Sequence, residues 1–328
     1  MLRPYMIRPP APRVRRRAMI PCGSPAPPPR HDPGPPPRGF VRTQHAASLQ
    51  IRAMPYTAYM HAPPPIHIMF LGTGTSNGVP VLGCTCAVCA SADPCDARLR
   101  TSALVTCGET TVLIDVGPDF RQQALRAGLR RVDAVLLTHA HADHIAGLDD
   151  LRPLNYASGT STRIFGDAET LAIVRERFAY AFAETTAQSS RPALDLHETL
   201  WFTPFTIGTL QIEPLAVHHG TWQISAYHIT LAAGGPTLGY VTDASHIPPA
   251  TAARLAGVDM LVLNALRPDP HPTHFSLSEA LVQVAVLAPG RARLVHMNHS
   301  IGHASTNAAL PPGVALAHDG LVETIGVV

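Results

Sequence analysis

The residues with the clearest chemical potential lie in one short stretch, directly after an apolar run. His139, His141, Asp143 and His144 follow the pattern H-x-H-x-D-H, which places four potential metal ligands among six consecutive residues. Imidazole nitrogens suit zinc, manganese and iron, and the added carboxylate oxygen favours a divalent transition metal. The pattern therefore predicts a metal centre at this point of the chain.

The spacing of these ligands predicts two neighbouring metal positions. His139 and His141 stand two residues apart on an extended segment, so their side chains point the same way. Asp143 and His144 fall at the turn into the next helix and can address a second position. Two ions about 4 Å apart can activate a water molecule and stabilise charge on the group that it attacks.

Further ligands stand at the ends of three other apolar runs. His218 and His219 end one run, Asp243 ends another, and His296 and His299 follow a third. The two oxygens of Asp243 can bridge two metals. A single histidine of this kind is more commonly a hydrogen-bonded core or surface residue. The position of all these residues at ends of apolar runs favours ligation instead.

Three of the six cysteines form a compact C-x-C-x2-C cluster at Cys84, Cys86 and Cys89. In a chain without an export signal, this spacing indicates a metal site rather than a disulfide framework. A structural zinc ion takes four ligands, so one ligand must come from elsewhere. The alternative is three reduced cysteines packed in a loop. We assign no role to Cys95 or Cys107.

The elements that must position these residues are predicted from apolar periodicity. The predicted strands cover residues 66–71, 103–106, 111–114, 134–137, 210–217, 224–231, 238–241, 260–263 and 294–297. The predicted helices cover residues 120–127, 168–178, 249–256 and 276–286. Ser276 and Glu279 form a capping box at the start of the last helix. Helices and strands alternate along the chain, which indicates an α/β fold.

Charge and proline content divide the chain into a tail and a folded body. Residues 1–65 contain 10 arginines, 17 prolines and one acid, whereas residues 66–328 contain 15 arginines and 22 acids, a net charge of −7. We expect 1–65 to be a disordered Pro/Arg-rich N-terminal extension. The alternatives are a start codon placed too early, with Met54, Met60 or Met69 as the true start, and an RNA-binding arm.

Composition excludes two classes of protein. The chain has 328 residues, of which 46% are apolar and 15% charged, and it contains no run of 18 uncharged apolar residues. This excludes a membrane-spanning helix and a wholly disordered chain. The apolar stretch after Arg15, Arg16 and Arg17 is too short for an export signal, so we expect a cytoplasmic protein.

Taken together, these motifs resemble those of the metallo-β-lactamase superfamily, and in particular the phosphoribosyl 1,2-cyclic phosphate phosphodiesterases and their relatives. Besides the H-x-H-x-D-H motif, the likeness is carried by residues 70–76, 83–89, 98–102, 114–121, 264–267, 274–277 and 296–299. It covers residues 66–328 nearly without a gap. The resemblance implies a four-layer αββα sandwich with the metals at one edge, between the two sheets.

The resemblance also implies how the candidate ligands divide between two divalent ions, zinc or manganese. One ion is held by His139, His141, His219 and Asp243, and the other by Asp143, His144, Asp243 and His296. His219 is preferred to His218 because, in relatives, the ligand lies five residues past a proline and often precedes glycine. Asp115 looks like the carboxylate that orients ligating histidine rings.

The family pattern implies two further assignments. His274 resembles the family's catalytic histidine, which contacts the phosphate or protonates the leaving oxygen, and it joins Asp143 as a catalytic residue. His271 is the weaker candidate for the histidine role. His299 completes the cysteine cluster as the fourth ligand of a structural zinc, which pins the loop 78–95 near the catalytic edge.

We therefore predict a metal-dependent hydrolase that acts on a small cyclic phosphodiester. A ribonuclease Z-like tRNA 3′ endonuclease shares the metal ligands, but a net charge of −7 makes a poor surface for a polyanion, so we expect no nucleic-acid partner. The non-enzymatic alternative is a carrier that resembles protein B of pyrroloquinoline quinone synthesis. The resemblance implies that protein B itself lacks part of the ligand set at the catalytic edge. Related enzymes often pair, which leaves a homodimer open.

Overall fold

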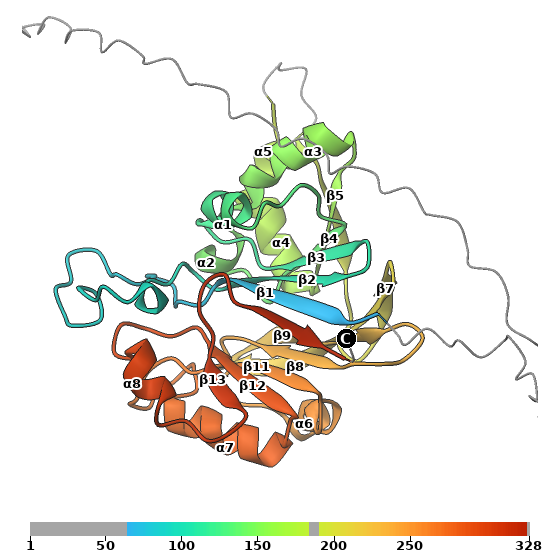
Figure 1. The fold of residues 1–328 in the computed structure, drawn as a ribbon. Helices are drawn as coiled ribbons and strands as arrows, with labels where there is room; N and C mark the ends of the chain where they lie inside the picture. The colour runs from blue at the N-terminus through green and yellow to red at the C-terminus, as the bar shows by residue number, and fades with distance from the viewer. Residues whose placement is uncertain (1–63, 184–189, 327–328) are drawn as a thin grey trace, which may run out of the picture. The chain divides into compact units, whose positions relative to one another are not determined.

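The computed structural model describes residues 64–183 and 190–326, and the fold belongs to the unit Thr57–Val328. It contains two seven-stranded sheets (Figure 1). The first sheet has the order β14 (Val322–Ile325), β1 (Ile66–Gly72), β2 (Ser102–Cys107), β3 (Thr110–Ile114), β4 (Ala134–Leu136), β5 (Thr162–Gly166) and β6 (Leu194–Glu198). The second has the order β13 (Val314–Leu316), β12 (Arg291–Val295), β11 (Met260–Asn264), β10 (Leu238–Val241), β9 (Trp222–Leu231), β8 (Leu210–His219) and β7 (Phe205–Ile207).

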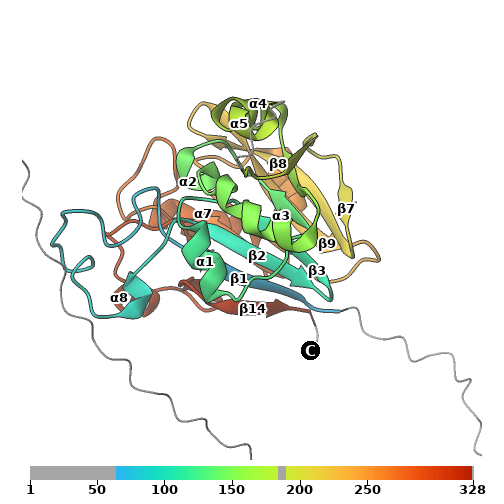
Figure 2. The ribbon, with the colours of Figure 1, turned by 90° about the horizontal axis from the view of Figure 1, so that it is seen from above.

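Helices cover the outer face of each sheet (Figures 1 and 2). The first sheet carries α1 (Phe120–Arg126), α2 (Ala142–Ile145), the 3₁₀ turn η2 (Leu148–Leu151), α3 (Arg152–Ser158), α4 (Ala168–Arg177) and α5 (Ala179–Phe182). The second carries α6 (Pro249–Leu255), α7 (Leu277–Leu287) and α8 (His303–Asn307). A further 3₁₀ turn, η1 (Pro94–Asp96), lies in the loop between β1 and β2. The expected four-layer αββα sandwich is therefore confirmed.

The main core lies between the two sheets. Fully buried Ile68 and Val105 of the first sheet belong to the same apolar cluster as Tyr227, Ile229 and Val262 of the second. Two further clusters fill the space between each sheet and its helices. Three apolar layers separate four layers of secondary structure, so each sheet is buried on both faces and the polar site residues are confined to the sheet edges.

Strand direction determines where the site residues meet. β3, β4, β5 and β6 run parallel to one another, and so do β10, β11 and β12. β8 runs in the same direction as β10, because β9 is antiparallel to both. The carboxyl ends of these strands therefore meet at one edge of each sheet, and the predicted ligands lie at or just past the ends of β4, β8, β10 and β12.

Most predicted elements coincide with observed ones. All nine predicted strands overlap β1–β4 or β8–β12, and the four predicted helices overlap α1, α4, α6 and α7. The capping box is confirmed, since the Ser276 amide donates to Glu279 Oε2 at 2.8 Å and Ser276 Oγ accepts from the Glu279 amide. One strand prediction was displaced: residues 294–297 overlap β12, but β12 begins at Arg291 and ends before His296.

The predicted N-terminal extension lies, up to residue 63, outside the described residues and stays a prediction. Among the helices of the described ranges, none has both the length and the apolar character needed to cross a membrane.

Candidate metal centre

The first cluster consists of three histidines from two sheets. The ligand atoms of His139, His141 and His219 all lie within 4.8 Å of one another, and His139 Nε2 is 2.9 Å from His141 Nδ1. The first two follow β4, and His219 is the last residue of β8. His219 Nδ1 lies 2.8 Å from the Thr273 carbonyl oxygen, so it donates there and leaves Nε2 free for ligation. The structure thus brings together the three predicted histidines.

The second cluster combines two carboxylates with two buried histidines. The ligand atoms of Asp143, His144, Asp243 and His296 lie within 4.8 Å of one another. His144 Nε2 is 3.3 Å from Asp143 Oδ2 and 3.4 Å from Asp243 Oδ2, and His296 Nε2 is 3.0 Å from Asp243 Oδ1. This mixture of nitrogen and oxygen donors suits a divalent transition metal.

Asp243 joins the two clusters. Besides its place in the second cluster, it forms a group with His219 and His274 in which the ligand atoms again lie within 4.8 Å of one another. Its Oδ1 is 3.1 Å from His274 Nε2. Because His219 belongs to the first cluster, one carboxylate reaches both, as a bridging ligand must.

Unusual backbone conformations present three of these side chains. Asp115, Asp243 and His296 have φ values of 60°, 58° and 57°, in the left-handed region that residues other than glycine seldom adopt. Each lies one or two residues past the end of a strand, at β3, β10 and β12. Strained conformations of this kind concentrate at functional sites, and here all three residues contact the second cluster or belong to it.

A close backbone approach fixes the segment that carries Asp143. A Cβ atom added at Gly117 would lie 2.1 Å from the Asp143 carbonyl oxygen, and one added at Gly147 would lie 2.0 Å from the Gly117 carbonyl oxygen. Only glycine fits such contacts. The loop after β3 therefore packs directly against α2.

Buried histidine nitrogens without hydrogen-bond partners indicate whether these residues suit a metal. His144 Nε2 and both ring nitrogens of His296 are buried, and within the described part of the chain none makes a hydrogen bond of good geometry. Buried polar atoms without hydrogen bonds are rare and costly. The nitrogens of His144 and His296 that face the carboxylates are the atoms that a cation would engage, so the donor set fits divalent metal ions.

The electrostatics of the clusters favour positive charge. Burial, reinforced by the neighbouring His144, holds the pKa of His139 well below its ordinary value, which gives the neutral imidazole that ligation needs. Burial opposes protonation of His296 as well, but the carboxylates of Asp243 and Asp143 outweigh it and raise the pKa of His296 to about 9. The negative charge of these two buried carboxylates therefore favours the binding of a cation.

Asp115 and Thr138 support the second cluster from behind. Asp115 is fully buried, and its Oδ2 lies 2.7 Å from His144 Nδ1. Asp115 accepts hydrogen bonds from the amide and the hydroxyl of Thr138, both at 2.8 Å. The Thr138 hydroxyl also lies 3.1 Å from His139 Nδ1. Asp115 therefore lies where a carboxylate that orients the His144 ring must lie. Thr138, directly before the histidine motif, links Asp115 to His139 through its hydroxyl group.

We predict that Asp115→Asn weakens binding of one metal ion by about 10- to 100-fold, the usual effect of losing a partner that orients a ligand. All neighbours of this carboxylate are donors, so an amide NH₂ group leaves one of them without an acceptor. Calorimetric titration of the metal-free protein measures the effect. Asp133→Asn, a carboxylate that accepts from the Thr111 amide, is the control and keeps wild-type affinity. Unchanged affinity in Asp115→Asn would contradict the assignment.

The predicted catalytic histidine lies beside the clusters. His274 Nε2 faces Asp243 Oδ1 at 3.1 Å, and its Nδ1 lies 3.2 Å from His271 Nδ1 and 2.9 Å from the Thr273 hydroxyl. Its side chain is 11% exposed, and burial lowers its pKa. His218, by contrast, takes part in no metal-ligand cluster of the described residues, and its backbone pairs with His246.

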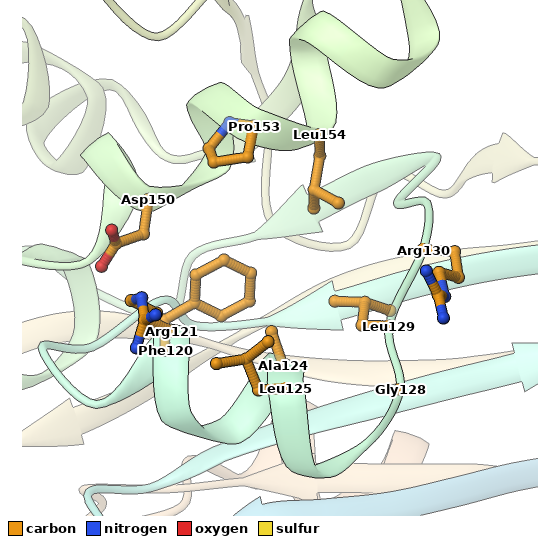
Figure 3. A pocket seen from close by; sticks show the side chains of 10 residues that line it. All are labelled: Phe120, Arg121, Ala124, Leu125, Gly128, Leu129, Arg130, Asp150, Pro153 and Leu154. Carbon is orange, nitrogen blue, oxygen red and sulfur yellow. The ribbon is translucent and has the colours of Figure 1, made fainter. Parts of the chain in front are cut away.

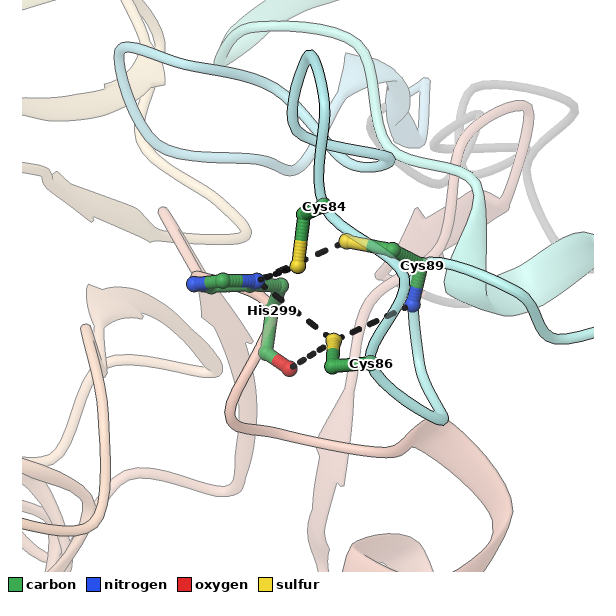
Figure 4. Close-up of side chains that lie close together, drawn as sticks. All are labelled: Cys84, Cys86, Cys89 and His299. Atoms are coloured by element: carbon green, nitrogen blue, oxygen red, sulfur yellow. Dashed lines mark hydrogen bonds between the residues drawn. The ribbon is translucent and has the colours of Figure 1, made fainter.

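The cysteine cluster forms a separate site with His299 (Figure 4). His299 Nδ1 lies 3.2 Å from Cys84 Sγ, 3.5 Å from Cys86 Sγ and 3.4 Å from Cys89 Sγ. Bond lengths to tetrahedral zinc imply a separation of about 3.5 Å between sulfur and nitrogen ligands. The Cys89 amide donates to Cys86 Sγ and lowers the pKa of that thiol to about 6, which favours the thiolate that binds metal.

An apolar groove with a volume of about 340 Å³ lies between α1 and the η2–α3 segment (Figure 3). It is lined by Phe120, Arg121, Ala124, Leu125, Gly128, Leu129, Arg130, Asp150, Pro153 and Leu154. None of these residues belongs to the two histidine–carboxylate clusters or to the cysteine cluster. The groove is therefore not part of the candidate centre.

Comparison with known proteins decides the family. Residues 110–297 match the family model described as "Beta-lactamase superfamily domain". The chain belongs to this superfamily. Its members are mostly metal-dependent hydrolases, and the fold implies divalent metal ions.

Three known proteins are similar to this chain over most of its length. An octanoyltransferase of Porphyromonas gingivalis is 36% identical over 256 residues, which are 77% of this chain but only half of that protein. Coenzyme PQQ synthesis protein B of Methylorubrum populi is 30% identical over 302 residues, covering 78% of this chain and 99% of that one. A crystal structure described as a new diphosphatase from the PhnP family is 37% identical with a TM-score of 0.72, covering 80% and 99%.

Proposed function

We propose that this chain is a dinuclear metal-dependent phosphodiesterase that hydrolyses small cyclic phosphodiesters. The proposal depends above all on Asp243, which lies within ligand distance of both clusters. His139, His141 and His219 would hold one ion, and Asp143, His144 and His296 the other. Zinc and manganese both suit these nitrogen and oxygen donors. A third ion, zinc, would occupy the cysteine cluster in a structural role.

Divalent ions held by these residues would supply two effects, the activation of water for attack on phosphorus and the neutralisation of charge on the non-bridging phosphoryl oxygens. The chain itself positions the reacting groups. Asp243, which lies near the ligand atoms of both clusters, would set the spacing of the two positions, Asp143 would hold the second ion, and Asp115 orients His144. The bond from phosphorus to the new oxygen forms as the bond to one ring oxygen breaks, so a cyclic diester opens to a monoester.

His274 is suited to assist the leaving oxygen. Its Nε2 faces the bridging Asp243 at 3.1 Å, so a phosphoryl group between the clusters would lie within reach of this nitrogen. In its imidazolium form, which the contact with the Asp243 carboxylate favours, His274 passes the Nε2 proton to the departing alkoxide, so that the alkoxide leaves as an alcohol and the ring becomes neutral. Positioned acid catalysis of this kind contributes about 10²- to 10⁴-fold in rate.

We predict that His274→Ala lowers kcat by about 10²- to 10⁴-fold on a cyclic alkyl phosphodiester and changes KM little. The loss is smaller on bis-p-nitrophenyl phosphate, because p-nitrophenolate is a good leaving group that needs little protonation. Both catalytic ions stay bound. His218→Ala, whose side chain belongs to none of the described clusters, is the control and retains wild-type kcat. An equal loss on the two substrates would rule out proton donation by His274.

A second substrate class is favoured by one relative. The 37% identical crystal structure is described as that of a diphosphatase, an enzyme that hydrolyses a link between two phosphates. The same metal positions can stabilise attack on such a phosphoanhydride. We therefore include diphosphate-linked compounds beside cyclic diesters as candidate substrates. The net charge of −7 on residues 66–328 still opposes nucleic-acid substrates.

A substrate panel tests the proposal. Metal-loaded protein is assayed with bis-p-nitrophenyl phosphate, ribose 1,2-cyclic phosphates, cyclic nucleotides, dinucleoside diphosphates and a precursor tRNA. We expect turnover of a cyclic phosphodiester and none of the tRNA. Preference for the dinucleoside diphosphates would favour the second class. Two bound ions without turnover of any compound would contradict catalysis and favour a carrier.

A further inference from the structure

A fully buried arginine contacts the segment that links the cysteine cluster to the histidine–carboxylate clusters. Arg98 is 1% exposed and stands in the segment between η1 and β2. Its Nη2 pairs with Asp96 Oδ1 at 3.2 Å. A buried guanidinium is costly unless its donors find partners. The remaining partners of this side chain therefore indicate what it does.

Those partners are two carbonyl groups of one short segment. Arg98 Nη1 donates to the Asn298 carbonyl oxygen at 3.0 Å, and Nη2 donates to the Ile301 carbonyl oxygen at 2.7 Å. This segment, residues 296–301, carries His296 of the second cluster and His299 of the cysteine cluster. A planar guanidinium offers its donors in a fixed fork, so it sets the distance and angle between the two carbonyls that it binds.

The backbone of Arg98 anchors the other side of the cysteine site. Its amide donates to the Val79 carbonyl oxygen at 2.7 Å, and its carbonyl oxygen accepts from the Val79 amide at 2.8 Å. Val79 leads directly into the loop that carries Cys84, Cys86 and Cys89. A single residue thus joins the cysteine loop to the segment that supplies a ligand to each site.

His296 is the residue most in need of such support. Its φ of 57° is strained, and a strained conformation persists only where the surroundings enforce it. The Met297 amide donates to the Thr73 carbonyl oxygen at 3.0 Å, and the Asn298 amide donates to the Leu266 carbonyl oxygen at 2.8 Å. Arg98 adds the contact on the far side of Asn298, where the chain turns toward His299.

We propose that Arg98 is a positioning residue that couples the two kinds of site: an ion in the cysteine cluster fixes the 296–301 segment, and Arg98 transmits this order to His296. Binding at the cysteine cluster then strengthens binding of the ion that His296 holds. The inference rests on the proposed dinuclear centre. Because coupling is reciprocal, the ion at His296 also strengthens binding at the cysteines.

Metal titration tests the coupling without any assay of turnover. Metal-free protein first receives one equivalent of Co²⁺, whose thiolate charge-transfer absorption reports loading of the cysteine cluster. Binding of Mn²⁺ to the remaining positions is then measured by calorimetry, with and without the Co²⁺. We expect wild-type protein to bind one Mn²⁺ about tenfold more tightly when the cysteines are loaded, within the range reported for partners of metal ligands.

The variant Arg98→Lys distinguishes a role in positioning the 296–301 segment from a role in the stability of the fold alone. Lysine carries its donors on a single nitrogen and lacks the planar fork with which Arg98 holds the two carbonyls from Nη1 and Nη2. We therefore expect the tenfold enhancement to vanish in this variant while Mn²⁺ still binds at the position of His139. Arg100→Lys is the matched control, since Arg100 pairs with Asp119 at 3.0 Å instead, and it keeps the enhancement. A lower Tm with unchanged coupling in Arg98→Lys would overturn the inference.

Two further results keep the inference open to refutation. Wild-type protein that binds two Mn²⁺ ions with equal affinity in the presence and absence of Co²⁺ would overturn it, even if Arg98→Lys does not fold. Wild-type protein with one Mn²⁺ position or none would instead overturn the dinuclear centre itself.

Discussion

Asp243→Asn lowers phosphodiester turnover by about a thousandfold. Metal ions contribute several kcal/mol of transition-state stabilisation, and a loss of about 4 kcal/mol corresponds to about a thousandfold in rate. Asp243 is 2% exposed and lies near the ligand atoms of both clusters, so an amide in its place weakens both positions. Steady-state kinetics on bis-p-nitrophenyl phosphate, with metal analysis of the same sample, measure both effects.

A matched substitution shows that the effect belongs to the site. Asp269→Asn changes an exposed carboxylate in the loop before His271 and leaves turnover and metal content at wild-type values. Retention of two ions and of wild-type turnover in Asp243→Asn would contradict the bridging role. Loss of turnover with both ions retained would mean that Asp243 acts on the substrate rather than on the metals.

Cys84→Ser removes one of three metal ions and destabilises the fold. The free energy of binding a structural zinc contributes to folding, and a loss of about 4 kcal/mol lowers Tm by about 10 °C for a domain of this size. Cys84 Sγ lies 3.2 Å from His299 Nδ1, and serine is a poor zinc ligand. Metal analysis and thermal unfolding of the purified protein measure the two effects.

Cys95→Ser is the control for this substitution. Cys95 stands on the same loop, and its amide donates to Asp93, but its sulfur belongs to no metal cluster of the described ranges. We expect three ions and wild-type Tm in this variant. Three ions in Cys84→Ser as well would contradict the structural zinc site and favour three reduced cysteines packed in a loop.

The sequence predicted the ligand clusters better than it predicted their supports. His139, His141, Asp143 and His144 are close in sequence, so their spacing alone indicates that they act together. The pairing of Asp243 with both clusters depends on β4, β8, β10 and β12 ending at one edge. The resemblance supplied that information. Composition and spacing could not, because alternating helices and strands are equally compatible with one sheet or two.

Two residues that support the clusters, Thr138 and Arg98, were not predicted, because their contacts form only in the tertiary structure. Thr138 has no motif of its own, although a hydroxyl directly before a histidine ligand is a hint that sequence offers. Arg98 falls within a stretch that carried the resemblance, yet its role depends on carbonyl groups about 200 positions away, at Asn298 and Ile301. Backbone carbonyls are the same in every residue, so no sequence pattern reveals such partners.

Periodicity missed five strands, β5, β6, β7, β13 and β14, and all of them except β5 lie at a sheet edge. β6 and β14 lie at sheet edges, where one side of the strand has no neighbouring strand and apolar alternation weakens. β7 and β13 have three residues each, too few for a period to register. In contrast, β8 and β9 have ten residues each, and their apolar runs were recognised.

The most direct measurement is a titration of the metal-free protein with Mn²⁺ or Zn²⁺, in which bound ions and turnover of a phosphodiester are followed in the same samples. With the cysteine cluster already loaded, the account predicts that turnover appears as a second ion joins the first and stops rising once both are bound. Full turnover with a single catalytic ion, or two bound ions without turnover, would contradict it.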